Sequence, residues 1–525
     1  MRRKHFFIST FVVFTTVGAF SVVWPATLWV MVILGPLAVL GFYDAFQRTH
    51  AILRNYPIVG HGRYMLESLR PELHQYFVES NTGGKPFSRE ERSAIYQRAK
   101  DVRDTVPFGT QRDVDAKRYE YITHSLICGE TKEPPRIRIG GTDCKKPYKA
   151  SLLNISAMSY GSLSDAAVLA LNGGAKDGGF AHNTGEGGVS PYHLRPGGDL
   201  IWQVGTGYFG CRGSNGRFDP EKFTETVAHD EIKMVEVKLS QGAKPGHGGI
   251  LPAAKVTAEI AGIRGIPVGE TCVSPPSHTA FSTPTGLLEF VARLRELSGG
   301  RPVGIKLCVG RPEEFLSICL AMRETGVAPD YIAVDGGEGG TGAAPIEFSN
   351  HVGMPLTDGL VTVHNLLVGF GLRGNIRIIA SGKVTTGFRM ARLMALGAEA
   401  CYSARAMMFA LGCIQARRCN ANDCPTGVAT QDRNLISGLV VQDKRKRIYR
   451  YHEATLESLM ELVAAAGLVS PLELKPHHIY RRGEDYKVQT FEEIYEWLEP
   501  GQLLSADGIS PQYAIMLERA TADSF

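Results

Sequence analysis

The sequence predicts a (β/α)8 TIM barrel that is preceded by an N-terminal transmembrane helical hairpin. From residue 152 onwards, short apolar runs alternate about eight times with stretches of helical periodicity. Such alternation favours a parallel α/β fold, and about eight repeats favour a closed barrel over an open sheet. Ahead of the barrel lie two long uncharged runs, each close to the ~20 residues that cross a bilayer as a helix.

The two uncharged runs cover about residues 6–23 and 26–43, and Trp24-Pro25 separates them. Basic residues flank the pair on both outer sides: Arg2, Arg3, Lys4, Arg48 and Arg54. The positive-inside rule then predicts a membrane anchor whose ends, and the catalytic domain that follows, lie in the cytoplasm. Two alternatives are a cleaved signal peptide ending near Ala26 and a single long tilted or re-entrant helix.

Changes in composition divide the chain into four parts. The predicted parts are a membrane hairpin (1–46), a helical and irregular linker that packs on the barrel (47–144), the barrel with a cysteine-rich segment (145–435) and a C-terminal helical cap (436–525). In the linker, Ser88 with Glu91 forms a capping box that predicts a helix start. In the cap, the basic run 444–450 predicts a solvated helix face, with anionic lipid as the alternative partner.

The barrel prediction depends on eight apolar runs. The predicted strands are LLNISAM (152–158), GFAHNTG (179–185), LIWQVG (200–205), MVEVKLS (234–240), VGIKLCV (303–309), DYIAVDGG (330–337), RIIASG (377–382) and ACYSA (400–404). The predicted helices between them include residues 252–263, 284–297, 312–326 and 385–397. IPVGETCVSP (266–275) is a possible ninth strand. A Rossmann-type sheet is the alternative, but no Gly-x-Gly-x-x-Gly follows an early strand.

Composition excludes several other classes of protein. A net charge of +4 over 525 residues is too small to indicate nucleic-acid binding. The ten cysteines of so long a chain do not resemble a disulfide framework, which favours a reducing compartment. Glycine is in excess, with 59 residues that cluster in the barrel region, where the backbone would approach a phosphate or a flat ring closely.

The loops after the last three predicted strands indicate a phosphate site. In a barrel these loops often bind phosphate through backbone N–H groups and a helix N-terminus. The candidate residues are Gly336, Gly337, Ser381, Gly382 and Ser403. Each glycine pair taken alone is more typical of a turn, but three such loops in succession predict a bound phosphate.

Cations and amides end the earlier strands. The residues are Gln203, Lys238, Gln241, Lys244 and Lys306. Such groups suit the N1–C2=O edge of a flavin, and they also suit a dicarboxylate substrate. Lys306 stands inside an apolar run, where an unpaired ammonium is costly, so the alternative is an internal salt bridge with Glu186 or Asp335.

Three cysteines lie close together near the end of the barrel region, with the spacing Cys413-x5-Cys419-x4-Cys424 and a proline directly after. Thiolates at this density indicate a metal or iron–sulfur site. Three ligands suit a 3Fe-4S cluster, whereas zinc usually takes a fourth Cys or His at short range. The alternative is three ordinary buried cysteines without a chemical role.

Several stretches together resemble the FMN-binding synthase domain of glutamate synthase. They are SAMSYGSLS (156–164), NTGEGG (183–188), QVGTGYFG (203–210), KLSQGAKPGHGG (238–249), SPP (274–276), VGIKL (303–307), DGGEGGTGAAP (335–345) and the cysteine segment ending in CPTGVATQ. The resemblance implies an FMN-containing barrel with a 3Fe-4S cluster beside the flavin. In that family, FMN reduced through the cluster converts the imine formed from ammonia and 2-oxoglutarate into L-glutamate.

The resemblance also implies roles for single residues. Cys413, Cys419 and Cys424 would hold the cluster. Met158, Ser159, Gln203 and Lys306 would face the flavin, and Gly382 with its neighbours would lie near the phosphate. Glu186, Gln241 and Lys244, together with Lys306, would form the catalytic site around 2-oxoglutarate or a similar 2-oxo acid.

The sequence departs from the family pattern at the substrate end. His247 stands in the Gly-rich stretch after QGAKP, Ser277-His278-Thr279 follows SPP, and Tyr208 stands where the family usually carries a cation. No amidotransferase domain precedes the barrel, which predicts another source of ammonia or amine. The electron donor is unknown, and a ferredoxin-like protein is one candidate. The alternatives are an N-substituted glutamate synthase subunit and a membrane-tethered redox carrier or sensor without turnover.

Overall fold

The computed structural model describes residues 2–102, 105–505 and 508–525. It divides into two compact units, residues 1–89 and residues 90–525. Residues 47–89, the first part of the predicted linker, belong to the same compact unit as the two apolar helices.

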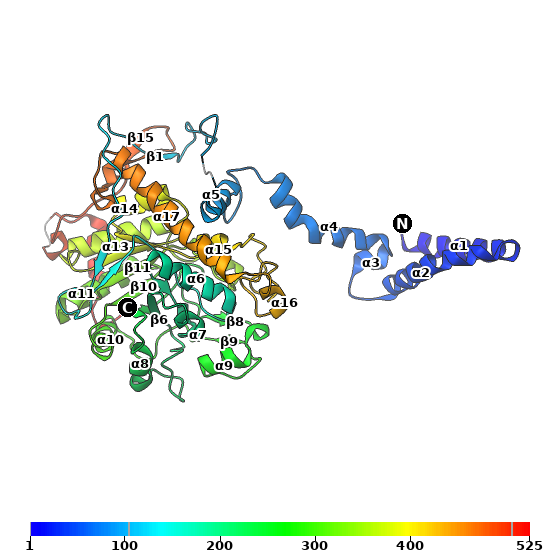
Figure 1. Cartoon of the computed structure of the whole chain (residues 1–525), viewed down its shortest axis with the longest axis horizontal. Helices are drawn as coiled ribbons and strands as arrows, with labels where there is room; N and C mark the ends of the chain where they lie inside the picture. Colours follow the sequence, from blue (N-terminus) through cyan, green and yellow to red (C-terminus); the bar gives the residue numbers. More distant parts are fainter. Residues whose placement is uncertain (1, 103–104, 506–507) are drawn as a thin grey trace. The chain divides into compact units, whose positions relative to one another are not determined.

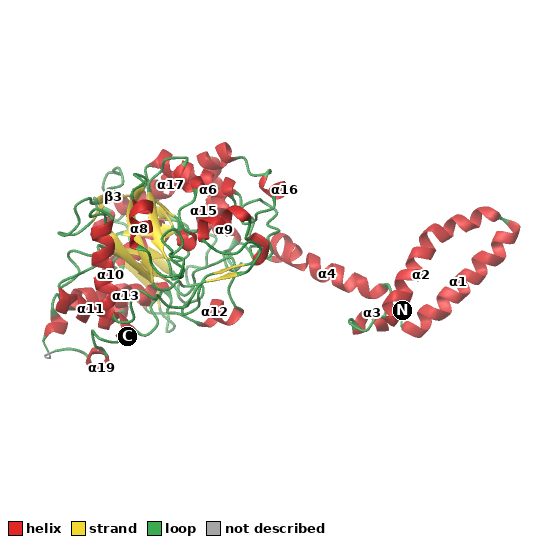
Figure 2. Cartoon of the chain, turned by 90° about the horizontal axis from the view of Figure 1, so that it is seen from below, coloured by secondary structure: helices red, strands yellow, loops and turns green. Residues whose placement is uncertain are grey.

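The first unit contains the two apolar helices. They are α1 (Arg3–Val23) and α2 (Met31–Phe46), and the 3-10 helix η1 (Pro25–Val30) connects them. Figure 2 shows α1 and α2 as the two arms of a hairpin. Two helical stretches, Arg3–Val23 and Pro25–Phe46, are long and apolar enough to cross a membrane, with mean hydropathies of 2.1 and 2.0. A signal sequence near an N-terminus has the same properties, so length and composition alone do not establish a span.

The base of the hairpin is closed by one buried carboxylate. Asp44, near the end of α2, accepts hydrogen bonds from the backbone N–H of Ile58 (2.9 Å) and from Nε2 of His61 (2.9 Å). The chain continues through α3 (Ala51–Asn55) and α4 (Val59–Leu73). The carboxylate therefore ties the end of α2 to the start of α4.

The second unit is built on a closed parallel barrel, as predicted. Its eight strands are β4 (Leu153–Ile155), β5 (His182–Asn183), β6 (Leu200–Val204), β7 (Ile232–Lys238), β10 (Val303–Leu307), β11 (Tyr331–Asp335), β12 (Arg377–Ser381) and β13 (Ala400–Ser403). Each strand lies within or overlaps one of the eight predicted runs. Strands β13 and β4 close the ring, with Cys401 opposite Leu153 and Ser403 opposite Ile155. Figure 2 shows the strands enclosed by helices.

Helices follow the strands in the order expected for a barrel (Figure 1). They are α6 (Asp165–Gly178), α7 (Pro191–Leu194), α8 (Pro220–Val227), α9 (Ala258–Arg264), α10 (Pro284–Leu297), α11 (Pro312–Thr325), α12 (Ile346–His351), α13 (Leu356–Gly369), α14 (Gly387–Ala395), α15 (Arg405–Leu411) and α16 (Arg433–Ile436). The four helices predicted between strands are found with ends at most six residues from the predicted ones, and α10 has both predicted ends.

The possible ninth strand does not join the barrel. Cys272–Val273 forms β9, which pairs antiparallel with β8 (Ile250–Leu251) in a separate two-stranded sheet. Both strands belong to the long excursion between β7 and β10, which also carries α9. The apolar run thus forms a small ribbon beside the barrel.

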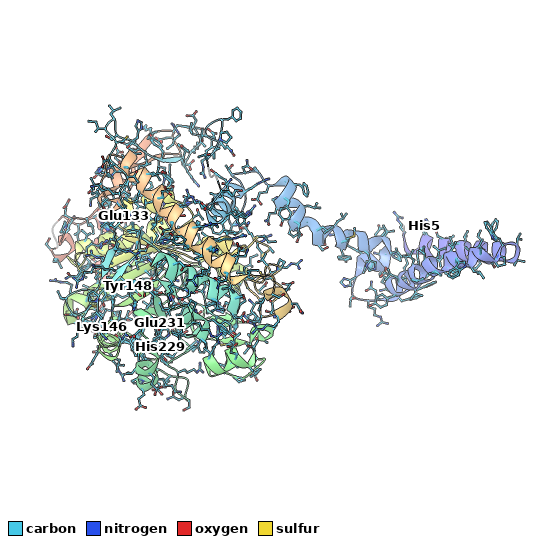
Figure 3. The ribbon with its side chains drawn as sticks, viewed as in Figure 1. His5, Glu133, Lys146, Tyr148, His229 and Glu231 are labelled. Carbon is cyan, nitrogen blue, oxygen red and sulfur yellow. The ribbon has the colours of Figure 1, made fainter. Side chains whose placement is uncertain are left out.

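A β-hairpin closes the N-terminal end of the barrel. It consists of β2 (Ile137–Ile139) and β3 (Tyr148–Ala150). The Tyr148 hydroxyl donates to a carboxylate oxygen of Asp199 (2.8 Å), just before β6, and the Lys146 N–H donates to the Gly300 carbonyl (2.8 Å), just before β10. Lys146 and Tyr148 are labelled in Figure 3 and mark this face. The site described below lies at the opposite, C-terminal ends of the strands.

Short strands occur in the linker, which was predicted to be helical and irregular, and in the cap, which was predicted to be helical. Strand β1 (Glu120–Ile122) of the linker pairs with β14 (Ile479–Arg482), and β14 pairs with β15 (Val488–Thr490) of the cap. This correction concerns a pairing between distant parts of the chain, which local periodicity cannot show. The other elements of these regions are α5 (Arg89–Lys100), α17 (Val441–Ala465), α18 (Phe491–Ile494) and α19 (Pro511–Arg519).

The long helix α17 packs on the outer helices of the barrel. A Cβ at Gly174 in α6 would lie 2.6 Å from the Ile448 side chain, so the two helices are in backbone contact there. Arg445 of the basic run forms an ion pair with Asp177 of α6, and Arg447 pairs with Asp443. Part of the basic run is therefore used within the protein.

Removal of the first helices should leave the barrel intact. A chain that begins at residue 79 lacks both apolar helices and α4 but keeps α5 and the whole second unit. We expect it to be monodisperse without detergent and to unfold in urea at the same midpoint as the full-length protein in detergent. An aggregated product without a cooperative transition would contradict the division into two units.

Candidate active site at the C-terminal end of the barrel

A buried carboxylate organises the interior of the barrel. Glu236 of β7 is fully buried and accepts hydrogen bonds from Asn183 Nδ2 (2.8 Å), Gln203 Nε2 (2.7 Å) and the Tyr402 hydroxyl (3.2 Å). Burial raises the pKa of Glu236, while the charge of Lys306 and these hydrogen bonds oppose the rise. The predicted residue Gln203 is thus held in place by a neighbouring strand.

Lys306 forms the internal salt bridge that the sequence left as an alternative. Its Nζ lies 3.5 Å from Asp335 Oδ2, and both side chains are buried. Burial lowers the pKa of Lys306, but Asp335, Glu236 and Glu186 more than offset it, and the net pKa is raised. Lys306 therefore keeps its positive charge inside the barrel.

A second ion pair lies at the ends of β5 and β7. Lys238 Nζ is 2.7 Å from Glu186 Oε2. Burial alone would raise the pKa of Glu186, but Lys238, Lys244 and Arg264 hold it below the ordinary value. Three cations thus surround one predicted catalytic carboxylate, and Arg264 is a member that the sequence reasoning missed.

Lys244 is buried in the loop after β7. Its Nζ donates to the Ala343 carbonyl (3.0 Å), in the loop after β11. Burial lowers the pKa of Lys244 to about 8, with Glu186 opposing and Lys238 adding to the shift. Gln241 contributes its backbone carbonyl, which accepts the N–H of Lys244 (3.3 Å).

Arg264, at the end of α9, is almost fully buried. Its Nη2 donates to the Tyr160 carbonyl (3.2 Å), and its guanidinium lies 5.1 Å from the centre of the Phe209 ring. Its Nε has no hydrogen-bond partner among the described residues. Because α9 belongs to an excursion outside the barrel, only the folded structure brings Arg264 to Glu186.

The loops after β7 and β11 approach at backbone distance. A Cβ at Gly242 would overlap the Gly336 carbonyl oxygen, and the Gly242 N–H donates to Asp335 Oδ2 (2.9 Å). A Cβ at Gly249 would lie 2.5 Å from Glu186 Oε1. The glycines of the QGAKPGHGG stretch therefore serve loop–loop contact as well as any contact with a ligand. His247 of this stretch turns its ring edge toward Phe348.

The predicted flavin-facing residues Met158 and Ser159 lie in the loop after β4. This loop contacts the loop after β5, because a Cβ at Gly185 would lie 2.7 Å from the Ser159 nitrogen. Gly185 has φ +64°, which favours glycine. Ser159 Oγ donates to Ser162 Oγ (3.0 Å) within the same loop.

Two of the predicted phosphate-binding amides are used by the protein itself. The Gly336 N–H donates to the Ser381 carbonyl (2.8 Å), and the Gly337 N–H donates to the Met354 carbonyl (2.8 Å). These two N–H groups therefore have acceptors within the protein, and the binding of a cofactor by this loop stays a prediction. Glycine is needed there because the loop packs tightly: a Cβ at Gly337 would lie 2.6 Å from the Gly353 carbonyl oxygen.

The remaining phosphate candidates stand at the ends of β12 and β13. Ser381 Oγ lies 3.5 Å from Ser156 Oγ, Ser403 Oγ donates to the Val384 carbonyl (2.7 Å), and Gly382 has φ +154°. Two cations accompany them, Lys383 and Arg405. Burial and the charge of Arg405 both lower the pKa of Lys383, so these cations are close to each other. Lys383 and Arg405 directly follow two predicted strands, and this position in the sequence could have identified them as candidates.

The three predicted cluster ligands lie in one irregular loop. Burial raises the pKa of the Cys413 thiol to about 12, with further contributions from Cys419 and Cys424. Burial alone would also raise the pKa of the Cys424 thiol. The Thr426 hydroxyl and the N–H groups of Ala429 and Val428 outweigh burial and hold this pKa below the ordinary value. Three residues of the loop that are not glycine have positive φ: Gln415, Arg417 and Asn422.

Within the described residues, no three His, Cys, Asp or Glu side chains converge closely enough to hold one metal ion. All ten cysteines are free thiols. In an iron–sulfur cluster each thiolate binds its own iron, so the thiols need not converge on one point. Three free thiols in one loop are a donor set of the kind that holds an iron–sulfur cluster.

The cysteine segment is attached to the loop after β4. Gln431 Nε2 donates to the carbonyls of Gly161 (3.1 Å) and Leu163 (2.9 Å), and Ser164 Oγ donates to the Gly427 carbonyl (2.7 Å). On its other side, the Tyr96 hydroxyl of α5 donates to the Cys413 carbonyl (2.6 Å). The segment is thereby held beside the loop that carries Met158 and Ser159.

Two of the three departures from the family pattern, Tyr208 and the segment after SPP, form one cluster. His278 Nε2 donates to the Lys238 carbonyl (2.9 Å), so Nδ1 of the neutral ring accepts the Tyr208 O–H (3.0 Å). The Tyr208 oxygen accepts the N–H groups of Thr279 (3.0 Å) and Ala280 (3.1 Å). Burial lowers the pKa of His278 to about 4, which keeps the ring neutral. Tyr208 therefore anchors the loop after SPP.

Replacing Tyr208 by Phe should destabilise the protein. The Tyr208→Phe change leaves the buried His278 Nδ1 and the N–H groups of Thr279 and Ala280 without their partner, at a cost of about 1–3 kcal/mol in the free energy of unfolding. Urea denaturation measures this cost. Tyr449→Phe, at a half-exposed position, is the control and should change the value by less than about 0.5 kcal/mol. Equal effects of the two changes would show that the Tyr208 hydroxyl does not anchor the loop.

Comparison with known proteins agrees with this geometry. Residues 101–469 match the family described as "Conserved region in glutamate synthase". The glutamate synthase large subunit-like protein YerD of Bacillus subtilis is 40% identical over 484 residues, which are 84% of this chain and 92% of that protein. The archaeal glutamate synthase (NADPH) of Methanocaldococcus jannaschii is 36% identical over 63% of this chain and 61% of its own length.

Among solved structures, a mutant of flavocytochrome b2 with benzoylformate has a TM-score of 0.43 and 13% identity, covering 85% of this chain and 91% of its own. A likeness at that level carries no functional argument. The family match and the two sequence relatives confirm the resemblance seen in the motifs. The chain belongs to the glutamate synthase family and is an oxidoreductase of the class that acts on CH–NH2 donors.

Proposed function

We propose that this protein is a membrane-anchored flavoenzyme that reduces an imine derived from 2-oxoglutarate, or from a similar 2-oxo acid, to L-glutamate or a related amino acid. FMN would be the cofactor, and a 3Fe-4S cluster would relay electrons to it. The observation that carries the proposal is the group of Lys238, Lys244 and Arg264 around Glu186, at the same end of the barrel as the cysteine segment.

The residues present fit FMN. Lys306 keeps a positive charge inside the barrel beside the buried amide of Gln203, which suits the pyrimidine edge of a flavin. Lys383 and Arg405 lie close together after β12 and β13, and two neighbouring cations suit a phosphate. Gly382, Ser381 and Ser403 would complete the phosphate loops.

The residues present also fit an iron–sulfur cluster. Cys413, Cys419 and Cys424 are free, and each influences the charge of another. The N–H groups that stabilise the Cys424 thiolate are of the kind that surround cluster sulfurs. When bound, FMN would supply hydride to the acceptor and the cluster would supply the electrons that reduce FMN again.

The chain's own residues would bind and orient the acceptor. Lys244 and Arg264 are the cations available to carboxylates, because Lys238 is paired with Glu186 at 2.7 Å. Arg264 has an Nε without a hydrogen-bond partner among the described residues. The charge of the same guanidinium interacts with that of Glu186. Glu186 would orient the nitrogen of the imine as a hydrogen-bond acceptor. The three cations are buried and Glu186 is largely buried, which limits the access of water and strengthens each interaction.

The two apolar helices would serve as the anchor, with the barrel in the cytoplasm. Arg2, Arg3 and Lys4 before α1, and Arg48 and Arg54 after α2, support this orientation by the positive-inside rule. The electron donor would then be a cytoplasmic one-electron carrier, for which a ferredoxin-like protein is one candidate.

Loss of the positive charge of Lys244 should set an upper pH limit near 8 for the reaction. The pKa of Lys244 is lowered to about 8, so the ammonium is present below that pH and is lost as the pH rises through it. We expect kcat/KM for the 2-oxo acid to fall above about pH 8, and Lys244→Arg, which stays charged, to remove this limit. Lys244→Ala should slow flavin reoxidation by roughly ten- to a thousandfold with the flavin spectrum unchanged. The same pH limit in Lys244→Arg would exclude Lys244 as its origin.

The reaction itself is tested by reoxidation of the reduced protein. Purified protein is reduced, and flavin absorbance is followed after addition of 2-oxoglutarate with ammonia, and in parallel with methylamine. Faster reoxidation with methylamine would favour an N-substituted glutamate synthase, a variant that the changed Tyr208–His278 cluster makes worth testing. Cys424→Ser should abolish the EPR signal of the cluster and keep FMN. Reoxidation with neither mixture would contradict the proposed function and leave a redox carrier.

A further inference from the structure

One buried ammonium lies between the cysteine segment and the loop after β4. Lys255, at the end of the 3-10 helix η4 (Ala253–Lys255), is 2% exposed. Its Nζ donates to the Ala429 carbonyl of the cysteine segment (2.8 Å) and to the Ser162 carbonyl of the loop that carries Met158 and Ser159 (3.0 Å). The side chain therefore contacts both loops where they meet.

Lys255 differs from the buried lysines of the barrel interior in its counter-charge. Lys238 pairs with Glu186 and Lys306 with Asp335, whereas no carboxylate in the described parts of the chain forms an ion pair with Lys255. Burial of an ammonium without an opposite charge costs several kcal/mol. Burial lowers the pKa of Lys255, and the thiolate charges of Cys419 and Cys424 oppose that shift.

We propose that Lys255 supplies the positive charge that sets the reduction potential of the iron–sulfur cluster held by Cys413, Cys419 and Cys424. This inference rests on the proposed function, because it assumes that these cysteines hold a cluster. A cluster bound by three thiolates is anionic, so it is the counter-charge that the buried ammonium lacks. Charge and hydrogen bonding around a cluster are the means by which a protein tunes its potential.

The charge that the cluster gains on reduction determines whether Lys255 raises or lowers its reduction potential. A reduced one-electron iron–sulfur carrier gives one electron to the oxidised cluster, which becomes more negative by one charge, and no bond breaks and no proton moves. A fixed positive charge in a buried, weakly screened place stabilises the more negative state. Lys255 therefore raises the potential and makes the cluster a better acceptor. Two such transfers supply the two electrons that reduction of an imine needs.

The arrangement also explains why a lysine serves this purpose at this place. The ammonium is held by two carbonyl groups, which leave its charge uncancelled, and a carboxylate partner would have neutralised it.

The test is a redox titration of the full-length, cluster-containing protein in detergent, followed by the EPR signal of the oxidised cluster. Lys255→Gln removes the charge and keeps an N–H donor for the carbonyls, and Lys255→Arg keeps the charge. Lys222→Gln is the matched control, since Lys222 is exposed and also donates to a backbone carbonyl, that of Arg212 (2.9 Å). We expect a more negative midpoint potential in Lys255→Gln and values like the wild type in the other two.

A wild-type potential in a cluster-loaded Lys255→Gln protein would overturn the inference. If Lys255→Gln loses the cluster while Lys255→Arg keeps it, the charge retains the anion instead of setting its potential, which overturns the inference as stated. If both variants lose it, the fit of the side chain matters and its charge does not, which overturns the inference. The flavin spectrum and the urea midpoint show in each case whether the barrel is folded.

The same experiment separates this inference from the proposed function. A wild-type protein that shows no 3Fe-4S signal, even after reconstitution with iron and sulfide, contradicts the proposed function before any variant is compared. A wild-type protein with the signal, together with an unchanged Lys255→Gln potential, contradicts only the assignment to Lys255.

Discussion

The arrangement of the site depends on one buried carboxylate, that of Glu236. A charge or a polar group without solvent must be matched by partners, and Glu236 takes them from strands on both sides: Asn183, Gln203 and Tyr402 donate to it, and Lys306 lies near it. These partners are thereby fixed in position and charge. Lys306 in turn holds Asp335, and Asp335 accepts the N–H of Gly242. A chain of polar contacts thus leads from the barrel interior to the loops of its C-terminal end.

At those loops, close backbone approach replaces side-chain packing. Gly242 touches the backbone of Gly336, and Gly249 leaves room for the carboxylate of Glu186. Any side chain at Gly242 would force the loop after β7 away from the loop after β11, and Lys244 would then lose its carbonyl partner at Ala343. Glycine is therefore needed in these loops for a steric reason. Without side chains at these positions, the two long loops can approach closely and place Lys244 beside Glu186.

Local patterns were sufficient to predict the barrel strands, because each strand depends on residues that are close in the chain. They could not show Arg264, which reaches Glu186 only after the excursion between β7 and β10 has folded, nor the contact of α5 with Cys413. They also suggested that Gly336 and Gly337 offer free N–H groups, whereas Ser381 and Met354 accept them. A hydrogen-bond donor is visible in a sequence, but the acceptor that it finds is a property of the folded chain.

The buried lysines divide into two kinds, and the division indicates where external anions are expected. Lys238 and Lys306 have carboxylate partners inside the protein, so their charges are balanced without a ligand. Lys244 and Lys255 are held by carbonyl oxygens alone in the described chain, and burial lowers the pKa of both. A protein that bound no anion at these places would gain stability from an apolar residue of the same size. One of the two faces the acceptor carboxylates expected beside Glu186, and the other faces the cysteine segment. The balance of charge thus favours two separate anionic groups, a substrate and a cluster, at one end of the same barrel.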